Sequence, residues 1–429
     1  MKERNNGWRR WIMLGLFALG IGTIHQLVYL RYSYYTPLME GLGLNNTQFG
    51  VTMSAFGIAS MILYFPGGWL ADRYSTKKLL CFSYVFTGLG GYYFATFPSY
   101  TMTILLHIYW AFVSILTFWA TINRAVSNLG DHDEQGKFFG MLEGVRGVFT
   151  TALAFGILTV FNKMGESQEG LKAVINLYST AIIMVGVLTW FAWGREEEME
   201  KVEKKRDTDF WKDARAILRT PALWCCALII FCNYFCYTGE SYLTPYTTDV
   251  FGMTATMGAV LSYLRGWSLQ MVGGPAGGFL ADRIGATKVA SLCFVIMAFS
   301  MFMFAFLPGN TALLYFMLAN MLALTLAKFA MRGVYYATVD EVRTPKRILG
   351  MAMGFVAMIG YAPDAFIYPL AGFVLDNYNA DGITGYRIIF GGVGVVLVIG
   401  FLVTLYLLSI IKKMRAEEAG KSAAQHAAT

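Results

Sequence analysis

Twelve long apolar stretches run along the chain, separated by short polar connections. Most of them reach the roughly 20 residues that a helix needs to cross the hydrocarbon core of a membrane. The backbone must satisfy its own hydrogen bonds there, and a helix does so. The pattern therefore predicts twelve membrane-spanning helices. They are expected at residues 9–41, 45–66, 79–97, 101–127, 136–162, 172–193, 220–250, 255–279, 288–307, 311–336, 348–374 and 386–411.

The composition supports the same fold class. Of the 429 residues, 56% are hydrophobic and only 14% are charged, whereas charged residues make up about 25% of ordinary soluble domains. The chain is therefore predicted to be an all-α polytopic membrane protein. Its six cysteines lie in or beside apolar stretches and form no CxxC motif. They are predicted to be packing residues, and no metal site is expected.

The net charge of +7 is concentrated in alternate connections between the apolar stretches. Basic residues are retained on the cytoplasmic side of a membrane, so this distribution predicts that both termini face the cytoplasm. A charge pattern set by topology does not indicate nucleic-acid binding. The predicted location is the inner membrane of a bacterium, which the chain crosses many times.

One loop motif occurs twice. GGWLADR begins at Gly67 and follows the second stretch, and GGFLADR begins at Gly277, 210 residues later, and follows the eighth (277 − 67 = 210). The same offset relates Gly140 and Gly350, each near the start of a later stretch. The repeat predicts two six-helix bundles joined by a charged segment. The predicted divisions are a first bundle at 1–193, a linker at 194–219, a second bundle at 220–412 and a cytoplasmic tail at 413–429.

These two loops resemble the signature of the major facilitator superfamily, G-x-L-a-D-R-x-G-r-[KR], and the resemblance extends over essentially the whole chain. It implies two pseudo-symmetric six-helix bundles that move a solute by alternating access. It also implies that the loops help to close the cytoplasmic side. The implied gating residues are Gly68, Asp72, Arg73, Lys77, Asp282 and Arg283.

Two narrower groups are also similar. QGKFFGMLEGVRG and GYAPDAFIYPLAGFVLDN resemble segments of bacterial inner-membrane transporters typified by YihN. The first apolar stretch is similar to that of the organophosphate:phosphate antiporters, which place an arginine in spans one and seven. Arg31 lies about two residues from the first of these positions, and the second position holds Tyr237.

Charged side chains inside membrane spans are costly and mark functional sites. Arg31, Arg146 and Arg265 are the predicted substrate contacts, because a guanidinium stays charged when desolvated and matches the oxygens of an anion. Internal pairing is the alternative, with Glu143 for Arg146 and with Glu240 or Asp364 for the other two arginines. Three tyrosines at similar depths are added to the substrate site for their hydroxyl groups: Tyr32, Tyr237 and Tyr361.

Glu240 and Asp364 are the predicted proton-coupling residues, because a carboxyl group in an apolar environment can take up and release protons near neutral pH. His25 titrates in the right range and is a third candidate. Its alternative role is packing. Three basic residues lie nearer the cytoplasmic ends of spans four and ten. The predicted inner-gate or loop partners are Arg124, Lys328 and Arg332, with direct contact to the substrate as the alternative. Lys328 and Arg332 share a helix face and could instead extend a positive inner vestibule.

The sequence thus predicts a secondary active transporter that takes up a small organic anion, such as a sugar acid, a carboxylate or a sulfonate, together with protons. It is expected to act as a monomer in membrane lipid and to use no cofactor. No nucleophile–histidine–acid arrangement, phosphate-binding loop or metal-ligand spacing indicates an enzyme. Export of drugs or metabolites, and exchange of one anion for another, are the alternatives.

Overall fold

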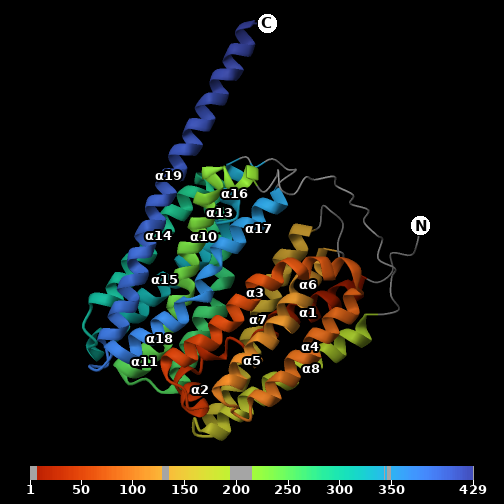
Figure 1. Ribbon diagram of the computed structural model, residues 1–429, viewed down its shortest axis with the longest axis vertical. Helices are drawn as coiled ribbons and strands as arrows, with labels where there is room; N and C mark the ends of the chain where they lie inside the picture. Colours follow the sequence, from red (N-terminus) through yellow and green to blue (C-terminus); the bar gives the residue numbers. More distant parts are fainter. Residues whose placement is uncertain (1–6, 128–134, 194–214, 343, 345–348, 429) are drawn as a thin grey trace. The chain divides into compact units, whose positions relative to one another are not determined.

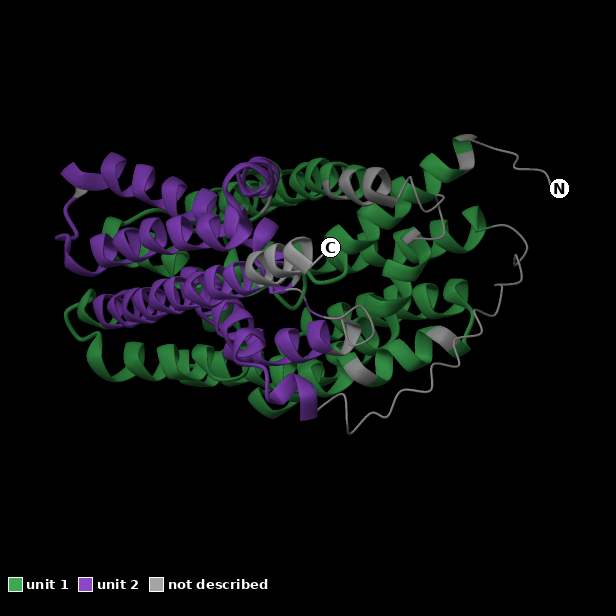
Figure 2. Cartoon of the chain, turned by 90° about the horizontal axis from the view of Figure 1, so that it is seen from above, with its two compact units in different colours: residues 1–202, 241–271, 364–385 green, residues 203–240, 272–363, 386–429 purple. Residues whose placement is uncertain are grey.

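The computed structural model describes residues 7–127, 135–193, 215–342, 344 and 349–428. All regular secondary structure in these residues is helical (Figure 1). The chain forms two compact units, coloured separately in Figure 2. Unit 1 comprises residues 1–202, 241–271 and 364–385, and unit 2 comprises residues 203–240, 272–363 and 386–429.

Unit 1 contains the helices of the first part of the chain and two later segments. Its helices are α1 (Gly7–Thr23), η1 (Leu30–Tyr32), α2 (Tyr35–Leu42), α3 (Asn46–Arg73), α4 (Thr76–Phe94), α5 (Tyr100–Ala111), η2 (Phe112–Trp119), α6 (Ala120–Ser127), α7 (Gln135–Lys163), α8 (Gln168–Ala192), α11 (Leu243–Phe251), α12 (Ala255–Tyr263), η5 (Leu264–Ser268) and α18 (Ile367–Tyr378).

Unit 2 contains most of the remaining helices. They are α10 (Pro221–Gly239), most of α13 (Gln270–Ile284), α14 (Ala286–Phe306), η6 (Thr311–Leu313), α15 (Leu314–Val334), α16 (Ala337–Glu341), α17 (Leu349–Gly360) and nearly all of α19 (Thr384–Ala428).

Among the described residues, eight helical runs are long and apolar enough to cross a membrane, and Arg10–Thr23 is a shorter apolar helix. The prediction of an all-α polytopic membrane protein is confirmed, and the helices are consistent with twelve spans. The six cysteines are all buried and none is in a disulfide. They therefore pack in the interior, as predicted from their apolar surroundings.

Two of the spans are interrupted near acidic residues. A short 3₁₀ segment, η4 (Glu240–Tyr242), separates α10 from α11, and η7 (Ala362–Ala365) separates α17 from α18. Pro363 lies within the second interruption. Proline cannot donate a backbone hydrogen bond and crowds the preceding turn, which explains why the helix breaks there. The interruptions place Glu240 and Asp364 at helix ends inside their spans.

The helices that follow the repeated loops start at equivalent positions. The loop from α3 to α4 ends at Thr76, the loop from α13 to α14 ends at Ala286, and these helix starts are 210 residues apart (286 − 76 = 210). In each GG pair only the first glycine is tightly packed. A Cβ on Gly277 would lie 2.2 Å from the carbonyl oxygen of Ala330, whereas a Cβ on Gly278 would meet nothing within 4 Å.

Some predictions fall outside the described part of the chain. Residues 194–214 of the predicted linker lie outside it, as does the side chain of Asp72. The four predicted divisions of the chain therefore remain predictions. Past Lys412 the chain continues as part of α19, a single helix of 45 residues, whose end extends away from α14 in unit 2 (Figure 1).

The paired glycines of the second loop motif provide a matched test of helix packing. Gly277→Ala should destabilise the protein by about 1–3 kcal/mol, because the new methyl group overlaps the α15 backbone. Gly278→Ala should be neutral or slightly stabilising, because alanine is the better helix former by about 1 kcal/mol. Thermal unfolding of both purified variants in one detergent measures the difference. Equal melting temperatures would contradict the tight approach of α13 to α15.

Candidate functional site

Unit 2 contains a cluster of charged and aromatic side chains inside its spans. We call it the basic–aromatic cluster. It comes from α10 and its C-terminal cap, from α15 and the two residues that follow it, and from the residue that follows α17. Its members are Tyr234, Tyr237, Glu240, Lys328, Arg332, Tyr335, Tyr336 and Tyr361.

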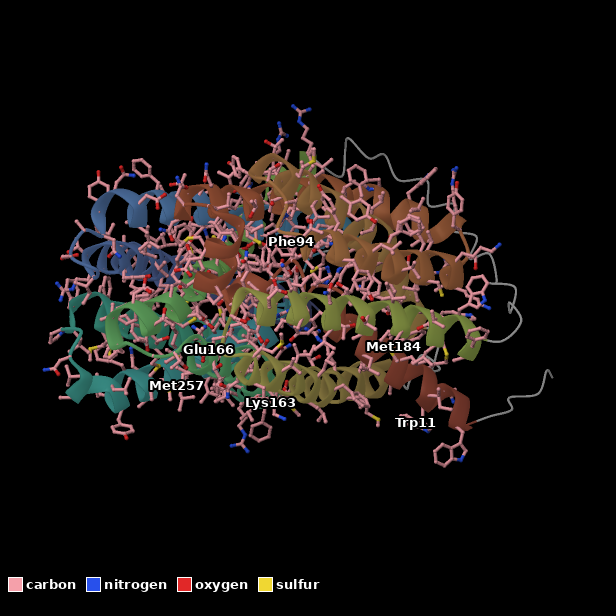
Figure 3. All side chains as sticks on the ribbon, turned by 90° about the horizontal axis from the view of Figure 1, so that it is seen from below. Trp11, Phe94, Lys163, Glu166, Met184 and Met257 are labelled. Carbon is pink, nitrogen blue, oxygen red and sulfur yellow. The ribbon has the colours of Figure 1, made fainter. Side chains whose placement is uncertain are left out.

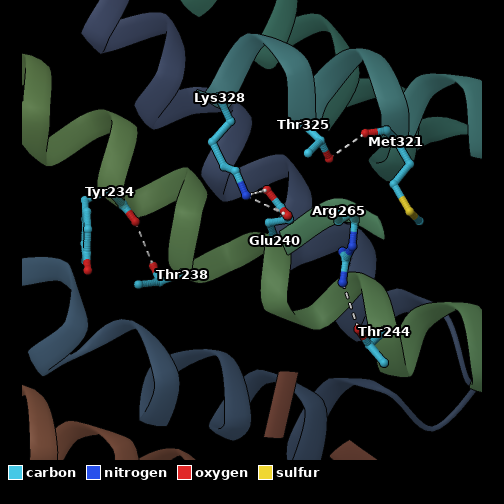
Figure 4. Close-up of polar contacts among 8 residues, drawn as sticks. All are labelled: Tyr234, Thr238, Glu240, Thr244, Arg265, Met321, Thr325 and Lys328. Atoms are coloured by element: carbon cyan, nitrogen blue, oxygen red, sulfur yellow. Dashed lines mark hydrogen bonds and ion pairs between the residues drawn. The ribbon is translucent and has the colours of Figure 1, made fainter. Parts of the chain in front are cut away.

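A buried ion pair lies in this cluster (Figure 4). The Nζ atom of Lys328 is 2.9 Å from Oε1 and 2.8 Å from Oε2 of Glu240, and the side chains of the two residues are 4% and 7% exposed. The ammonium group also lies 4.5 Å from the centre of the Tyr237 ring. Two opposite charges held together in an apolar interior depend strongly on each other, because neither has water as a substitute partner.

Arg332 is the second cation of the cluster and differs from Lys328 in its surroundings. Its guanidinium carbon lies 5.7 Å from the centre of the Tyr237 ring, and the residue is partly exposed. Within the described part of the chain, no carboxylate forms an ion pair with it. The cluster therefore contains a cation that forms no ion pair with any acidic side chain that the structure describes.

Tyrosine hydroxyl groups form the rest of the cluster. The hydroxyl of Tyr361 lies 2.8 Å from that of Tyr336 and 3.3 Å from that of Tyr335. The ring of Tyr234 stacks against Tyr237, with centroids 5.4 Å apart, and contacts Tyr361 at 4.7 Å. These hydroxyls can donate to or accept from a polar solute next to the guanidinium.

Helical spacing explains how the cluster assembles. On α15 and its extension, Lys328 is followed at intervals of four, three and one by Arg332, Tyr335 and Tyr336, which places all four on one face. On α10 and its cap, Tyr234, Tyr237 and Glu240 follow one another at intervals of three, so each lies beside the next on the helix surface. Sequence reasoning selected only Tyr237 and Tyr361 from the five tyrosines. The i, i+3, i+4 and i+7 spacing was the signal that identifies Tyr234, Tyr335 and Tyr336.

Arg31 lies in unit 1, where aromatic rings enclose it. Its side chain is buried, Nη1 donates to the carbonyl of Phe49 at 3.1 Å, and Nη2 donates to the hydroxyl of Tyr242 at 3.3 Å. The guanidinium carbon lies 4.6 to 5.6 Å from the centres of four rings, a cation–π arrangement that stabilises a desolvated cation. These rings belong to Tyr35, Phe49, Tyr242 and Tyr368.

The other predicted residues of unit 1 form separate contacts. The hydroxyl of Tyr32 is hydrogen-bonded to that of Tyr368, which lies 3.2 Å from a carboxylate oxygen of Asp364. Arg265 is buried and donates to the hydroxyl of Thr244 at 2.8 Å (Figure 4). The structure thus connects Tyr32 to Asp364 through Tyr368, a residue that sequence reasoning did not select.

His25 and Arg146 are both enclosed in unit 1. The imidazole of His25 has the rings of Phe56, Phe118 and Trp119 within 6.5 Å, centre to centre. This environment agrees with packing, the alternative role of His25. Arg146 is buried, with 9% of its surface exposed. The coupling role of His25 and the substrate role of Arg146 remain predictions.

The predicted gating residues lie at the ends of the motif helices. Arg124 Nη1 donates at 2.6 Å to the carbonyl of Ala71, in the last turn of α3, where a cation is favoured by the helix dipole. Arg73 stacks on the ring of Trp69 and Lys77 on the ring of Trp190. In the second copy, Arg283 stacks on Phe279 and Asp282 is exposed. In the first copy, a Cβ on Gly68 would meet nothing within 4 Å. Their gating role remains a prediction.

A polytopic helical protein with charged groups buried inside its spans has the architecture of a membrane transporter. The family model described as the Major Facilitator Superfamily matches residues 11–360. The chain belongs to this superfamily, and it is therefore a transporter and not an enzyme. The resemblance inferred from the two loop motifs is confirmed.

The similar proteins agree with this assignment. "Inner membrane protein YqcE" of Escherichia coli K12 is 33% identical over 88% of this chain and 90% of its own length. "Inner membrane protein YihN" of the same organism is 29% identical over 95% of this chain and 98% of its own length. The solved structure of a bacterial homologue of the human lysosomal transporter Spinster has a TM-score of 0.74 and 15% identity. It covers 94% of this chain, and the chain covers 98% of it.

Two more distant relatives have names that mention a solute. The "Probable galactarate/D-glucarate transporter GudP" of Pseudomonas putida is 22% identical over 82% of this chain and 81% of its own length. The "Nitrite extrusion protein" of Bacillus subtilis is 21% identical over 70% of this chain and 72% of its own length. Both names refer to transport of an anion by those proteins.

The ion pair between Glu240 and Lys328 gives a stability prediction. Glu240→Gln should lower the free energy of unfolding by about 3–5 kcal/mol, because it leaves the buried Lys328 ammonium without its carboxylate. Adding Lys328→Met should recover most of this loss. Thermal or denaturant unfolding in detergent measures both variants. A double variant that is less stable than Glu240→Gln alone would contradict mutual dependence of the two charges.

Proposed function

We propose that this transporter takes up a small organic anion, such as a sugar acid, a carboxylate or a sulfonate, together with protons. The solute crosses by alternating access between the two sides of the inner membrane, with both termini of the protein in the cytoplasm. The observation that supports this proposal most directly is the Arg332 guanidinium, which lies over the ring of Tyr237 and has no paired carboxylate among the described residues.

A guanidinium inside a membrane span favours an anion as a partner, and its planar donors match carboxylate or sulfonate oxygens. The hydroxyls of Tyr335, Tyr336 and Tyr361 lie in the same cluster and can bind the hydroxyl groups of a sugar acid. Within the basic–aromatic cluster, two cations face one carboxylate. The cluster therefore has an excess positive charge that an anionic solute would neutralise.

The ion pair supplies a route for proton coupling. When Glu240 takes up a proton it becomes neutral, and Lys328 loses the charge that compensates its own. The ammonium then favours a second negative group, which an entering anion provides. A proton on Glu240 and an anion on Lys328 and Arg332 thus stabilise each other, which is the thermodynamic requirement for symport.

The names of the distant relatives are consistent with an anionic cargo. GudP is named for two sugar diacids, and the Bacillus relative is named for nitrite. In this proposal the three arginines of unit 1, with Tyr32, Asp364 and His25, remain candidate contacts of the solute or the proton. Arg332 moves from the predicted inner gate to the substrate site.

Arg332→Gln should reduce uptake of D-glucarate, used as a probe, about 10- to 100-fold in proteoliposomes with an alkaline interior. The reason is the loss of a charge-assisted contact worth about 1.5–3 kcal/mol. Lys172→Gln is the matched control, because Lys172 is an exposed cation whose ion pair with Glu169 lies at the surface. Unchanged uptake by Arg332→Gln, with export of lipophilic cations, would support drug efflux instead.

Glu240→Gln tests the proton coupling. It should keep counterflow of the probe at equal pH, because binding and alternating access persist. It should lose accumulation driven by the pH gradient, because the glutamine cannot carry a proton. Both assays use the same batch of proteoliposomes, so reduced folding lowers both signals. Accumulation that depends on an opposing anion rather than on pH would indicate exchange.

A further inference from the structure

An acidic residue at the end of α18 holds the first turn of α3. The Oδ1 atom of Asp376 accepts the backbone amide of Asn46 at 3.1 Å, and Oδ2 accepts that of Thr47 at 2.8 Å. The side chains of Asn46 and Thr47 donate to the same two oxygens. Asp376 belongs to the second half of the sequence and α3 to the first, and all three residues lie in unit 1.

A second acidic residue makes the reciprocal contact. Glu166, in the loop between α7 and α8, accepts the backbone amides of Ala255 at 2.9 Å and Thr256 at 3.2 Å. These are the first two residues of α12, whose early turn lies beside Glu166 in Figure 3. Here the carboxylate comes from the first half of the sequence and the helix from the second, again within unit 1.

The two contacts are related by the internal repeat. Asp376 and Glu166 are 210 residues apart (376 − 166 = 210), and so are Thr256 and Asn46 (256 − 46 = 210). A carboxylate at a helix N-terminus pairs with free amides and with the positive end of the helix dipole. The repeat has therefore placed the same contact at two equivalent positions, once in each direction.

Each of the two helices, α3 and α12, also has an N-cap residue of its own. The side chain of Asn45 accepts the Gln48 amide at 2.8 Å, and that of Thr254 accepts the Met257 amide at 3.2 Å. The contacts with Glu166 and Asp376 involve the two preceding amides of each helix, which would otherwise face water. Glu166 also adopts a φ of 55°, which is uncommon for a residue other than glycine.

Other contacts between the two halves lie in the same unit. The hydroxyl of Ser33 donates to that of Ser262 at 3.0 Å, and the hydroxyls of Tyr34 and Tyr263 are 3.3 Å apart. A Cβ on Gly372 would lie 2.2 Å from the carbonyl oxygen of Asn46. With those of Glu166 and Asp376, these contacts form a seam within unit 1 that includes the N-terminal ends of α3 and α12, and α3 reaches the GGWLADR loop at its other end. The distribution of Lys and Arg predicts that these ends face outward.

We propose that Glu166 and Asp376 are gate residues that latch the outer ends of the two sequence halves in the closed state. The latch opens once in each transport cycle, when solute passes between the halves. The two contacts are related by the repeat, so each should contribute a similar free energy to the closed state. The proposal needs only that the protein is a transporter of this family and is independent of which solute it carries.

The test measures opening directly, with no solute. Ser262→Cys places a thiol in the seam, where the residue is 7% exposed. The rate of labelling by a hydrophilic maleimide is then measured for the full chain in nanodiscs, with the protein lacking this cysteine as background. Glu166→Gln and Asp376→Asn should each raise the rate about three- to tenfold. The double variant should raise it by about the product, because well-separated contacts add in free energy.

Asp381→Asn is the matched control. Asp381 is exposed, and it accepts the backbone amides of Ile383 at 3.1 Å and Thr384 at 2.8 Å, both close to it in the chain. The hydroxyl of Thr384 also donates to Asp381, and this hydrogen bond together with the two amides lowers the pKa of Asp381 to about 2. It therefore caps α19 with the same chemistry but without joining the two halves. Labelling that stays at the wild-type rate in the latch variants, or that rises equally in Asp381→Asn, would overturn the proposal.

Hydrogen exchange of the unaltered protein provides a test that requires no latch variant. Glu341 accepts the amides of Ala286 and Thr287 at the start of α14, a contact within one half of the sequence. If the latch opens, the amides of Asn46 and Thr256 should exchange severalfold faster than those of Ala286 and Thr287. Equal protection of the two sets would overturn the proposal even where a variant fails to fold.

Discussion

The absence of water from the membrane interior is the constraint on which this structure depends. Each backbone amide and each charged side chain inside the spans must find a partner in the protein, because an unpaired group costs several kcal/mol there. Helices satisfy the backbone. The cations have three different kinds of partner: a carboxylate for Lys328, aromatic rings, a carbonyl and a hydroxyl for Arg31, and a hydroxyl for Arg265.

Arg332 differs from these cations because its described contact is the ring of Tyr237, with no hydrogen bond or ion pair among the described residues. In a soluble protein, water could hydrate a guanidinium of this kind, and the missing carboxylate would not indicate a binding site. Inside a span the same arrangement is expensive unless a mobile partner completes it, and a transporter has such a partner in its solute. In the proposed symport the neighbouring ion pair is the proton-dependent element, because a proton on Glu240 would remove the negative charge that compensates Lys328.

Helix N-termini provide the second recurring interaction. Glu341 and Asp381 use it within one half of the sequence, where it only caps a helix. Glu166 and Asp376 use it between the halves, where the same hydrogen bonds hold two segments together. All four contacts have the same chemistry. A contact within one half of the sequence is a cap, and a contact between the halves is, in our proposal, a latch.

The sequence by itself determined the all-helical membrane fold, because apolar length and the distribution of charge reflect the thickness of the bilayer and its two sides. It also showed the repeat and the family, through two loops that are 210 residues apart. The interruption near Asp364 follows from the adjacent proline, and the face shared by Lys328 and Arg332 follows from helical spacing.

Only the tertiary structure decided which distant groups meet. Glu240 and Lys328 are 88 residues apart, and Asp376 and Asn46 are 330 apart. Four rings that surround Arg31 come from separate segments of the chain. Such contacts depend on the rotation and the crossing of packed helices. One sequence does not reveal these angles, because many side-chain combinations can fill the same apolar interface.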